Sequence, residues 1–174
     1  GPSTPDVRSM THFFWEVDRN DRVEQATKVI RNAGKTVVFV RTRHGVDRAT
    51  KQLRRSGVEA VAIHGARSQS QRDRSLKQFT DGQALALVAT DVAARGLHID
   101  DVSCVLHFDP PEDHKAYLHR SGRTARAGAT GVVVSFVDRS QHKSAKLLQK
   151  KLGLQVPLSK PAFEELSDSP PKLL

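Results

Sequence analysis

An arginine-rich stretch at residues 119–128, with the sequence HRSGRTARAG, carries the densest chemical signal in the chain. Arg120, Arg123 and Arg126 recur in it at every third position, and Gly122 and Gly128 permit a tight backbone. Arginine keeps its charge at neutral pH, and its planar guanidinium group matches the oxygens of a phosphate. The spacing therefore indicates phosphate binding. A solvated basic face is the alternative interpretation of the same residues.

Polar residues also follow four of the predicted strands. They combine small hydroxyls, exposed backbone and further arginines: Thr42 with Arg43, His64 with Gly65 and then Gln69 and Arg72, Thr90 with Asp91, and Asp109 with two prolines. The carboxyl ends of parallel strands share one edge of a sheet, where ligands bind, so these residues form a second set of phosphate contacts. Asp91 is expected to cap a short helix over 92–95 that Gly96 ends. Helix capping alone is the alternative for Thr90, Asp91 and Ser68.

The tripeptide Gly34-Lys35-Thr36 resembles the end of a phosphate-binding P-loop but lacks the rest of that motif. Val29 stands where the motif needs its first glycine. A P-loop also follows a strand and opens a helix, whereas a predicted helix precedes this tripeptide and a predicted strand follows it. We therefore interpret it as a helix-to-strand turn, and expect no cradle for a nucleoside triphosphate within this chain.

Alternating strand-like and helix-like segments must position these side chains. Apolar runs predict strands, and residues at helical spacing predict helices between them. The expected strands are 12–17, 36–41, 60–63, 84–89, 103–108 and 131–137, and the expected helices are 21–33, 45–55, 68–79, 92–95, 113–121 and 141–152, the last ended by Gly153. Short strands buried on both faces, alternating with helices, predict an α/β fold in which a mainly parallel sheet is flanked by helices in three layers.

The composition is that of a single globular domain, and its basic excess indicates either a nucleic-acid partner or a solvated surface that aids solubility. The chain has 174 residues, 28 Lys and Arg against 19 Asp and Glu, and a formal charge of +9, which predicts attraction to a polyanion. It contains no apolar run long enough to span a membrane. The single cysteine, Cys104, excludes an internal disulfide and a Cys-rich zinc site, and indicates a reducing, cytoplasmic location. No metal site is expected, because His114 and His119 are poorly spaced for one helix face.

Three parts are expected along the chain. Residues 1–10 are interpreted as a tag remnant and linker, because the first three residues are typical of a protease-cleavage scar. Residues 11–153 form the folded domain. Residues 154–174 carry several prolines among serines and acidic residues, which predicts a C-terminal tail or linker.

Four motifs in order closely resemble the C-terminal RecA-like domain of DEAD-box RNA helicases, in a form similar to the bacterial RhlE branch. The segment VVFVRT at 37–42 resembles motif IV, and QSQR at 69–72 resembles the Q-x-x-R motif. ATDVAARG at 89–96 resembles motif V, and HRSGRTAR at 119–126 resembles motif VI. The similarity covers roughly residues 11–152, and it implies a three-layer RecA-like fold.

The resemblance also implies a role for each matching residue. Arg123 and Arg126 would act as catalytic arginine fingers on the γ-phosphate of ATP, with Gly96 and His98 near the ribose. The RNA backbone would be held by Thr42, Arg43, Gly65, Gln69, Arg72 and Thr90. The domain interface and its loops would be served by Asp91, Arg95, His119 and Arg120. The chain departs from the family at His98, where an Asp is usual, and at Ala125, where a glycine is common.

The resemblance further implies that this chain is half of an enzyme. In this family a preceding domain carries the P-loop and the Asp-Glu-Ala-Asp motif. These two motifs bind ATP and supply most of the Mg²⁺ ligands. The expected partners are therefore RNA and that N-terminal RecA-like domain, with no membrane and a monomeric fragment that does not hydrolyse ATP alone. A free-standing RNA-binding module and the equivalent domain of a DNA-directed helicase are the alternatives. The arginine pair at 123 and 126 disfavours the first, and the complete set of Q-x-x-R and motif VI residues disfavours the second.

Overall fold

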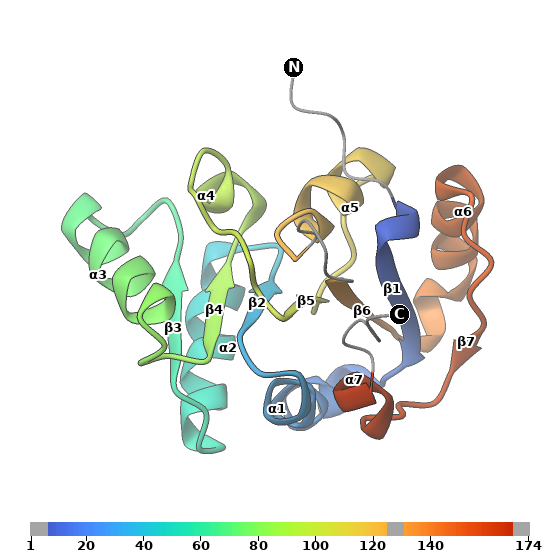
Figure 1. The fold of residues 1–174 in the computed structure, drawn as a ribbon, viewed down its shortest axis with the longest axis horizontal. Coiled ribbons are helices and arrows are strands. Elements are labelled where there is room, and N and C mark those ends of the chain that lie inside the picture. Colours follow the sequence, from blue (N-terminus) through green and yellow to red (C-terminus); the bar gives the residue numbers. More distant parts are fainter. Residues whose placement is uncertain (1–6, 125–130, 169–174) are drawn as a thin grey trace.

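One parallel sheet organises the computed structural model, with its strands in the order β3-β4-β2-β5-β6-β1-β7 (Figure 1). The structure describes residues 7–124 and 131–168. Within those residues every strand pair is parallel. The strands are β1 Met10–Glu16, β2 Thr36–Phe39, β3 Ala60–Ile63, β4 Ala86–Ala89, β5 Cys104–His107, β6 Gly131–Val137 and β7 Leu158–Ser159. The parallel α/β architecture predicted from the apolar runs is confirmed.

Helices connect the strands and cover both faces of the sheet. They are α1 Arg22–Ala33, α2 Arg43–Arg55, α3 Gln69–Thr80, α4 Asp91–Ala94, α5 His114–Ser121, α6 His142–Leu152 and α7 Glu164–Asp168. Single 3₁₀ turns lie at Val7–Ser9, Arg19–Asp21 and Arg139–Gln141. The six predicted strands and six predicted helices are all present, with ends displaced by no more than two residues. No helix in the described part of the chain has the length and apolar character needed to cross a membrane.

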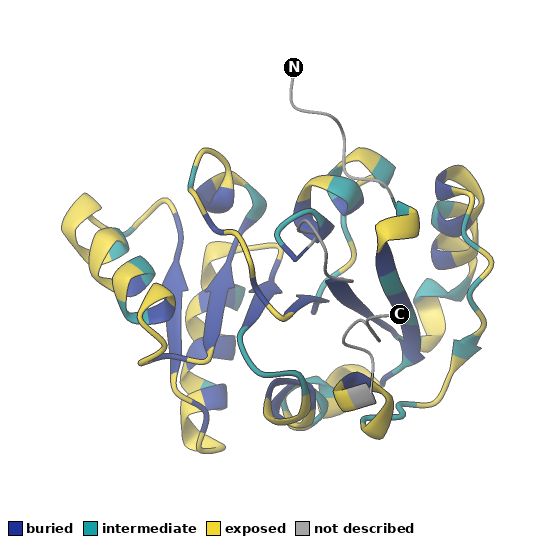
Figure 2. Ribbon diagram, in the orientation of Figure 1, coloured by how far each residue is buried: buried dark blue, intermediate teal, exposed yellow. Residues whose placement is uncertain are grey.

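The core consists of two apolar layers, one on each face of the sheet. Alternate strand residues point to opposite faces, so Val38 packs toward α1 and α2 while its neighbour Val37 packs toward α3. A third cluster places α5 and α6 over β1 and β6, on the same face as α3. Figure 2 shows strands β2 to β6 buried, the edge strand β7 partly exposed, and the helices exposed along their outer sides. Burial on both faces explains why the four residues of β4, ALVA, are all apolar.

The segment after α6 differs from the predicted tail or linker. Strand β7 pairs with β1, and α7 packs on α1. Leu166 is 2% exposed within the core, and the ring of Phe163 meets the ring of Trp15 edge-on at 5.3 Å. The prolines keep these elements short, but the two apolar side chains anchor them. At the other end, Met10, predicted in the linker, is the buried first residue of β1.

Two glycines end helices as the sequence predicts. Gly153 follows α6 with φ of 71°, a left-handed conformation that favours glycine. Gly34 follows α1 with φ of 92° and leads into β2. The Gly-Lys-Thr tripeptide is therefore a helix-to-strand turn, as expected, with no helix N-terminus available to hold a phosphate there.

Candidate functional site

The carboxyl ends of four neighbouring strands bring the predicted contact residues to one edge of the sheet. Strands β3, β4, β2 and β5 are consecutive in the sheet. Their ends lead directly into His64, Thr90, the Val40–Thr42 segment and Phe108. Residues separated by up to 68 positions in the chain, from Val40 to Phe108, thus share one edge, as the strand-end pattern predicts.

Two threonines at this edge begin helices. The side-chain oxygen of Thr42 accepts a hydrogen bond from the Gly45 amide at 2.9 Å, and that of Thr90 accepts one from the Ala93 amide at 3.2 Å. The expectation that Asp91 caps the short helix is wrong, because Thr90 is the N-cap and Asp91 is the first helical residue. A hydroxyl that accepts one bond still has its own O–H to donate, so capping leaves both threonines able to bind a phosphate.

The loop after β3 is tied to helix α2 through a histidine. The His64 side chain is buried, and its Nδ1 accepts the Ala66 amide at 3.1 Å. Its Nε2 therefore carries the proton and donates to the Asp47 carboxylate at 3.0 Å. Asp47 also accepts from Arg67 at 3.4 Å. These bonds hold the exposed backbone at Gly65, where the space around a Cβ position is open to 4 Å.

The Q-x-x-R pair lies in the first turn of α3. Arg72 Nη2 donates to Gln69 Oε1 at 2.7 Å, and Gln69 Nε2 donates to Asp73 at 2.8 Å. A capping box between Ser68 and Gln71 fixes the start of the helix. The polar ends of Gln69 and Arg72 are thereby oriented together beside the Gly65 loop.

The loop after α4 contains three residues that the resemblance assigns to the nucleotide or the interface, Arg95, Gly96 and His98. Gly96 has φ of 80°, and no atom lies within 4 Å of a Cβ built there. Arg95 and His98 are exposed on either side of it. His119, at the end of α5, is exposed too. The roles that the resemblance implies for Arg95, Gly96, His98 and His119 therefore remain predictions.

The Arg120 side chain is buried, and its guanidinium group binds other residues of this domain. Its side chain is 2% exposed, and its Nε and Nη2 donate to the two carboxylate oxygens of Asp91 at 2.6 and 2.7 Å. Its Nη1 donates to the Asp109 carbonyl at 2.8 Å. The guanidinium group also lies 5.1 Å from the centre of the Phe39 ring. This arrangement ties α5, α4 and the end of β5 together, so Arg120 holds loops, and its guanidinium has no exposed face for a partner domain.

A buried polar layer behind Arg120 was not predicted from the sequence. His107 Nδ1 accepts from Arg120 Nη1 at 3.2 Å, so the ring is neutral and its Nε2 donates to Ser121 at 3.3 Å. Burial, reinforced by the Arg120 charge and by His12, lowers the pKa of His107 well below its ordinary value. The Tyr117 ring stacks on His107 with 4.5 Å between centroids.

The same layer reaches the first strand. His12 Nε2 donates to the Val7 carbonyl at 2.8 Å, so its Nδ1 accepts from the Tyr117 hydroxyl at 2.6 Å. Burial lowers the pKa of His12, and burial raises the pKa of Tyr117 far above its ordinary value. The sequence carried one sign of this layer, a histidine within each of two apolar strands, His12 in β1 and His107 in β5.

Arg123 is held against the loop that follows α4. Its Nη1 donates to the Leu97 carbonyl at 3.1 Å, and its Nη2 makes a longer bond of 3.4 Å to the Ala94 carbonyl. Its Nε is buried and has no partner among the described residues. Carbonyls orient the guanidinium group without neutralising its charge, and donors remain for an anion. These features fit a phosphate. Arg126 and Ala125 lie outside the described residues.

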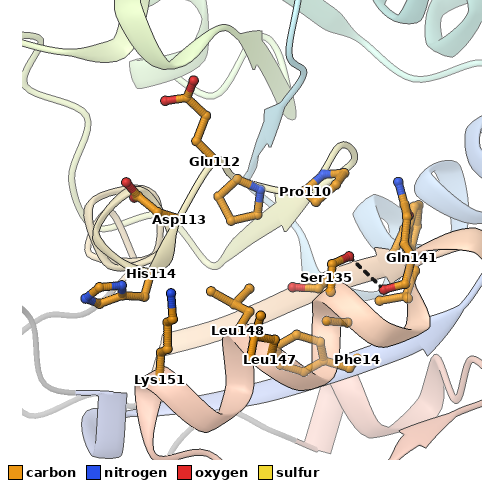
Figure 3. A pocket seen from close by; sticks show the side chains of 15 residues that line it. Phe14, Pro110, Glu112, Asp113, His114, Ser135, Gln141, Leu147, Leu148 and Lys151 are labelled. Carbon is orange, nitrogen blue, oxygen red and sulfur yellow. Dashed lines mark hydrogen bonds between the residues drawn. The ribbon is translucent and has the colours of Figure 1, made fainter.

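Two further observations bound the site. Over residues 7–124 and 131–168, no three His, Cys, Asp or Glu side chains are grouped as metal ligands. An apolar hollow of about 200 Å³ lies elsewhere, between the Pro110–His114 segment and α6. Figure 3 shows Phe14, Leu148 and Lys151 lining it, and none of the predicted site residues is in its wall. The predicted contacts instead lie on the open strand edge.

The chain matches known proteins along most of its length. Residues 20–128 match the family model described as Helicase conserved C-terminal domain. DEAD-box ATP-dependent RNA helicase 30 of Arabidopsis thaliana is 42% identical over 135 residues, which are 78% of this chain and 23% of that protein. The first curated relatives are matched over only 19–33% of their own length.

Solved structures agree in fold. The Escherichia coli DEAD-box protein SrmB, solved bound to regulator of ribonuclease activity A, is 35% identical with a TM-score of 0.76, and the match covers 90% of this chain and 92% of that one. Saccharomyces cerevisiae Dbp5, solved bound to RNA and ADP BeF3, is 27% identical with a TM-score of 0.80, over 94% of this chain and 44% of that one.

Proposed function

Because this chain belongs to the helicase C-terminal domain family, and within it to the DEAD-box proteins, we propose that it is the second half of an ATP-dependent RNA helicase. In the intact protein it would complete an ATP site between two domains and supply half of an RNA-binding surface. The finer placement in a bacterial RhlE-like branch is part of this proposal, and it is supported by the motif sequences.

The position of Arg123 carries the nucleotide half of the proposal. Bound ATP, held with Mg²⁺ mainly by the preceding domain, would supply the phosphoanhydride bond that water cleaves. The described residues contribute a guanidinium group that two loop carbonyls orient and leave charged. Together with Arg126, Arg123 would neutralise charge that develops on the γ-phosphate oxygens. An arginine in this role is worth about 10³–10⁵ in rate.

The strand edge carries the RNA half of the proposal. The hydroxyls of Thr42 and Thr90, the backbone at Gly65 and the oriented Gln69–Arg72 pair all lie along it. Contacts of these kinds bind phosphates and sugars and carry no base preference. Arg43, the first residue of α2, adds a positive charge at the same edge. The surface would thus hold RNA by its backbone, with 2′-hydroxyls distinguishing RNA from DNA.

Under this proposal the isolated chain binds RNA weakly but cannot hydrolyse ATP alone. ATP and RNA would each favour the closed arrangement of the two domains, so each would strengthen binding of the other. Closure would grip a single strand in a shape that a duplex cannot adopt, and hydrolysis would release it. Asp91 and Arg120 would support this mechanism by holding the loops that carry Thr90 and Arg123.

The test compares this chain with the intact protein. We expect the isolated chain to show no ATP hydrolysis, and the intact protein to show hydrolysis that RNA stimulates. A non-hydrolysable ATP analogue should raise the RNA affinity of the intact protein. An RNA affinity that the analogue leaves unchanged, together with no RNA-stimulated hydrolysis, would identify a binding module and refute the proposal. Equal stimulation by single-stranded DNA would refute the RNA assignment.

A further inference from the structure

An open groove between helices α1 and α2 begins at the end of motif IV and extends beyond the four motifs. It has a volume of about 730 Å³ and adjoins the carboxyl end of β2. Its apolar floor includes Val40, Ala49 and Phe108. Its basic lining consists of Arg19, Arg22, Arg41, His44, Arg48 and Arg55, and Asp109 is the single acidic residue among the described residues that line it. We call this feature the arginine groove.

One side of the arginine groove is a stripe along α2. His44, Arg48 and Arg55 are spaced four and seven residues apart, so they share one face of the helix. All three are exposed. Helix α2 has 13 residues, which gives a length of about 20 Å at 1.5 Å per residue. The stripe therefore extends positive charge well beyond the helix N-terminus.

Among the described residues, two arginines of the groove form ion pairs with aspartates, and three do not. Arg22 pairs with Asp109 at 2.6 Å and lies over the Phe108 ring at 4.2 Å, and Arg19 lies 3.7 Å from Asp138. In contrast, the guanidinium groups of Arg41, Arg48 and Arg55 have no ion pair with any described residue. These unpaired guanidinium groups keep their donors available for an anionic ligand.

We propose that the arginine groove binds a continuation of the RNA strand, beyond the contacts that the four motifs supply. This inference depends on the proposed function, since it extends the same RNA-binding surface. Thr42 belongs both to the predicted RNA contacts and to the groove lining, and Arg43 begins the helix that carries the stripe. A strand leaving the sheet edge at these two residues therefore meets the groove without a gap.

The chemistry of the groove favours nucleic acid over an acidic polypeptide. Protein interfaces depend on apolar anchors that fill pockets at their centre. Phe108, the largest apolar side chain of the floor, is 5% exposed and is covered by the Arg22 guanidinium. The groove thus offers charge, whereas the floor side chains Val40, Ala49 and Phe108 are each exposed by 5% or less. Arg48 and Arg55 are seven residues apart on α2, about 10.5 Å along the helix axis, which is close to three phosphate steps of about 3.4 Å along a stacked strand.

Fluorescence anisotropy with this chain and labelled single-stranded RNA tests the inference. A short RNA of about six nucleotides and a longer one of about sixteen bracket the range of such sites. The test variant is Arg48→Gln/Arg55→Gln, and the matched control is Lys143→Gln/Lys150→Gln, which removes two exposed charges from α6. Arg72→Gln reports on the motif contacts separately.

We expect the test variant to weaken binding of the longer RNA and to leave the shorter one unchanged. Losing two phosphate contacts should lower the slope of log K against log salt by about 1.4, since each contact contributes about 0.7. Between 50 and 200 mM salt, wild-type affinity should then fall about sevenfold more than that of the test variant. The control variant should behave as wild type, and Arg72→Gln should weaken both RNAs.

Three outcomes would overturn the inference. If Arg72→Gln weakens binding but Arg48→Gln/Arg55→Gln binds the longer RNA as wild type does, the groove inference fails and the proposed function stands. If no form of the chain binds either RNA at low salt, both fail. If a poly-glutamate peptide of matched charge displaces the longer RNA from wild type as well as unlabelled RNA does, and the test variant loses that peptide, the occupant is an acidic polypeptide.

Discussion

Replacing Asp91 by asparagine should destabilise the domain far more than the loss of an exposed charge does. The Asp91 carboxylate accepts two bonds from Arg120, at 2.6 and 2.7 Å. The Arg120 side chain is 2% exposed, whereas that of Asp91 is 34% exposed. Asparagine keeps the shape of the side chain but removes its charge, so Asp91→Asn leaves a buried guanidinium group without its counter-ion.

The cost follows from that burial. Removing one partner of a buried ion pair costs about 3–5 kcal/mol, and the exposure of Asp91 to solvent lowers this to about 2–4 kcal/mol. For a domain of this size, each kcal/mol shifts the melting temperature by about 2–4 °C, so we expect a fall of about 4–16 °C. Hydrogen exchange should also accelerate in α4, because Arg120 no longer holds its first residue.

Urea and thermal unfolding measure this effect, and Asp81→Asn is the matched control. Asp81 pairs with Lys77 at 3.0 Å on the exposed side of α3, and such a pair contributes about 0.3–0.5 kcal/mol. A double-mutant cycle with Arg120→Gln isolates the interaction from the individual substitutions. If Asp91→Asn costs no more than Asp81→Asn and α4 exchange is unchanged, the loop-holding role assigned to Arg120 is wrong.

Three other perturbations test the core. Burial lowers the pKa of His107 well below 6.5 and also lowers the pKa of His12. The unfolded chain therefore binds protons that the folded chain does not, so urea unfolding should show stability falling as the pH drops below about 6.5. A flat profile would contradict neutral burial. Leu166→Ala should lower the free energy of unfolding by about 2–4 kcal/mol in the same assay, because this buried leucine of α7 completes the core. The control Leu147→Ala, at a position 57% exposed, should lower it by less than about 0.5 kcal/mol. Equal losses for the two variants would favour the interpretation of residues 154–174 as a tail. Burial raises the pKa of Cys104 to about 12, so iodoacetamide should label the thiol at pH 8 only as fast as the domain unfolds, and rapid labelling of the native protein would contradict that burial.

The sheet was predictable because its strands are buried on both faces. Runs such as TVVF at β2 and ALVA at β4 leave little choice of structure once helices alternate with them. The shared strand edge then follows from parallel pairing alone. The α7 segment was missed because prolines at 157 and 161 are typical of a linker, and a single buried leucine gives no periodic pattern.

The interior of the site was less predictable than its location. Arg120 belongs to a basic run, which suggests a solvated or ligand-binding side chain, yet its partner Asp91 lies 29 residues earlier and meets it only through the fold. His12 and Tyr117 are 105 residues apart. A local sequence pattern indicates which face of a helix or strand a residue occupies. The Arg120–Asp91 and His12–Tyr117 pairs depend instead on how α4, α5 and β1 pack together.

Single-turnover ATP hydrolysis by the intact protein, with saturating RNA, tests the role of Arg123 most directly. Arg123→Ala should slow the chemical step by about 10³-fold or more, while ATP affinity changes little and Arg74→Ala, at an exposed position on α3, hydrolyses ATP as wild type does. Arg123→Lys keeps the positive charge but lacks the planar guanidinium group, so its rate of hydrolysis should lie between those of Arg123→Ala and wild type. An Arg123→Ala protein that remains folded and hydrolyses ATP at the wild-type rate would contradict the assignment.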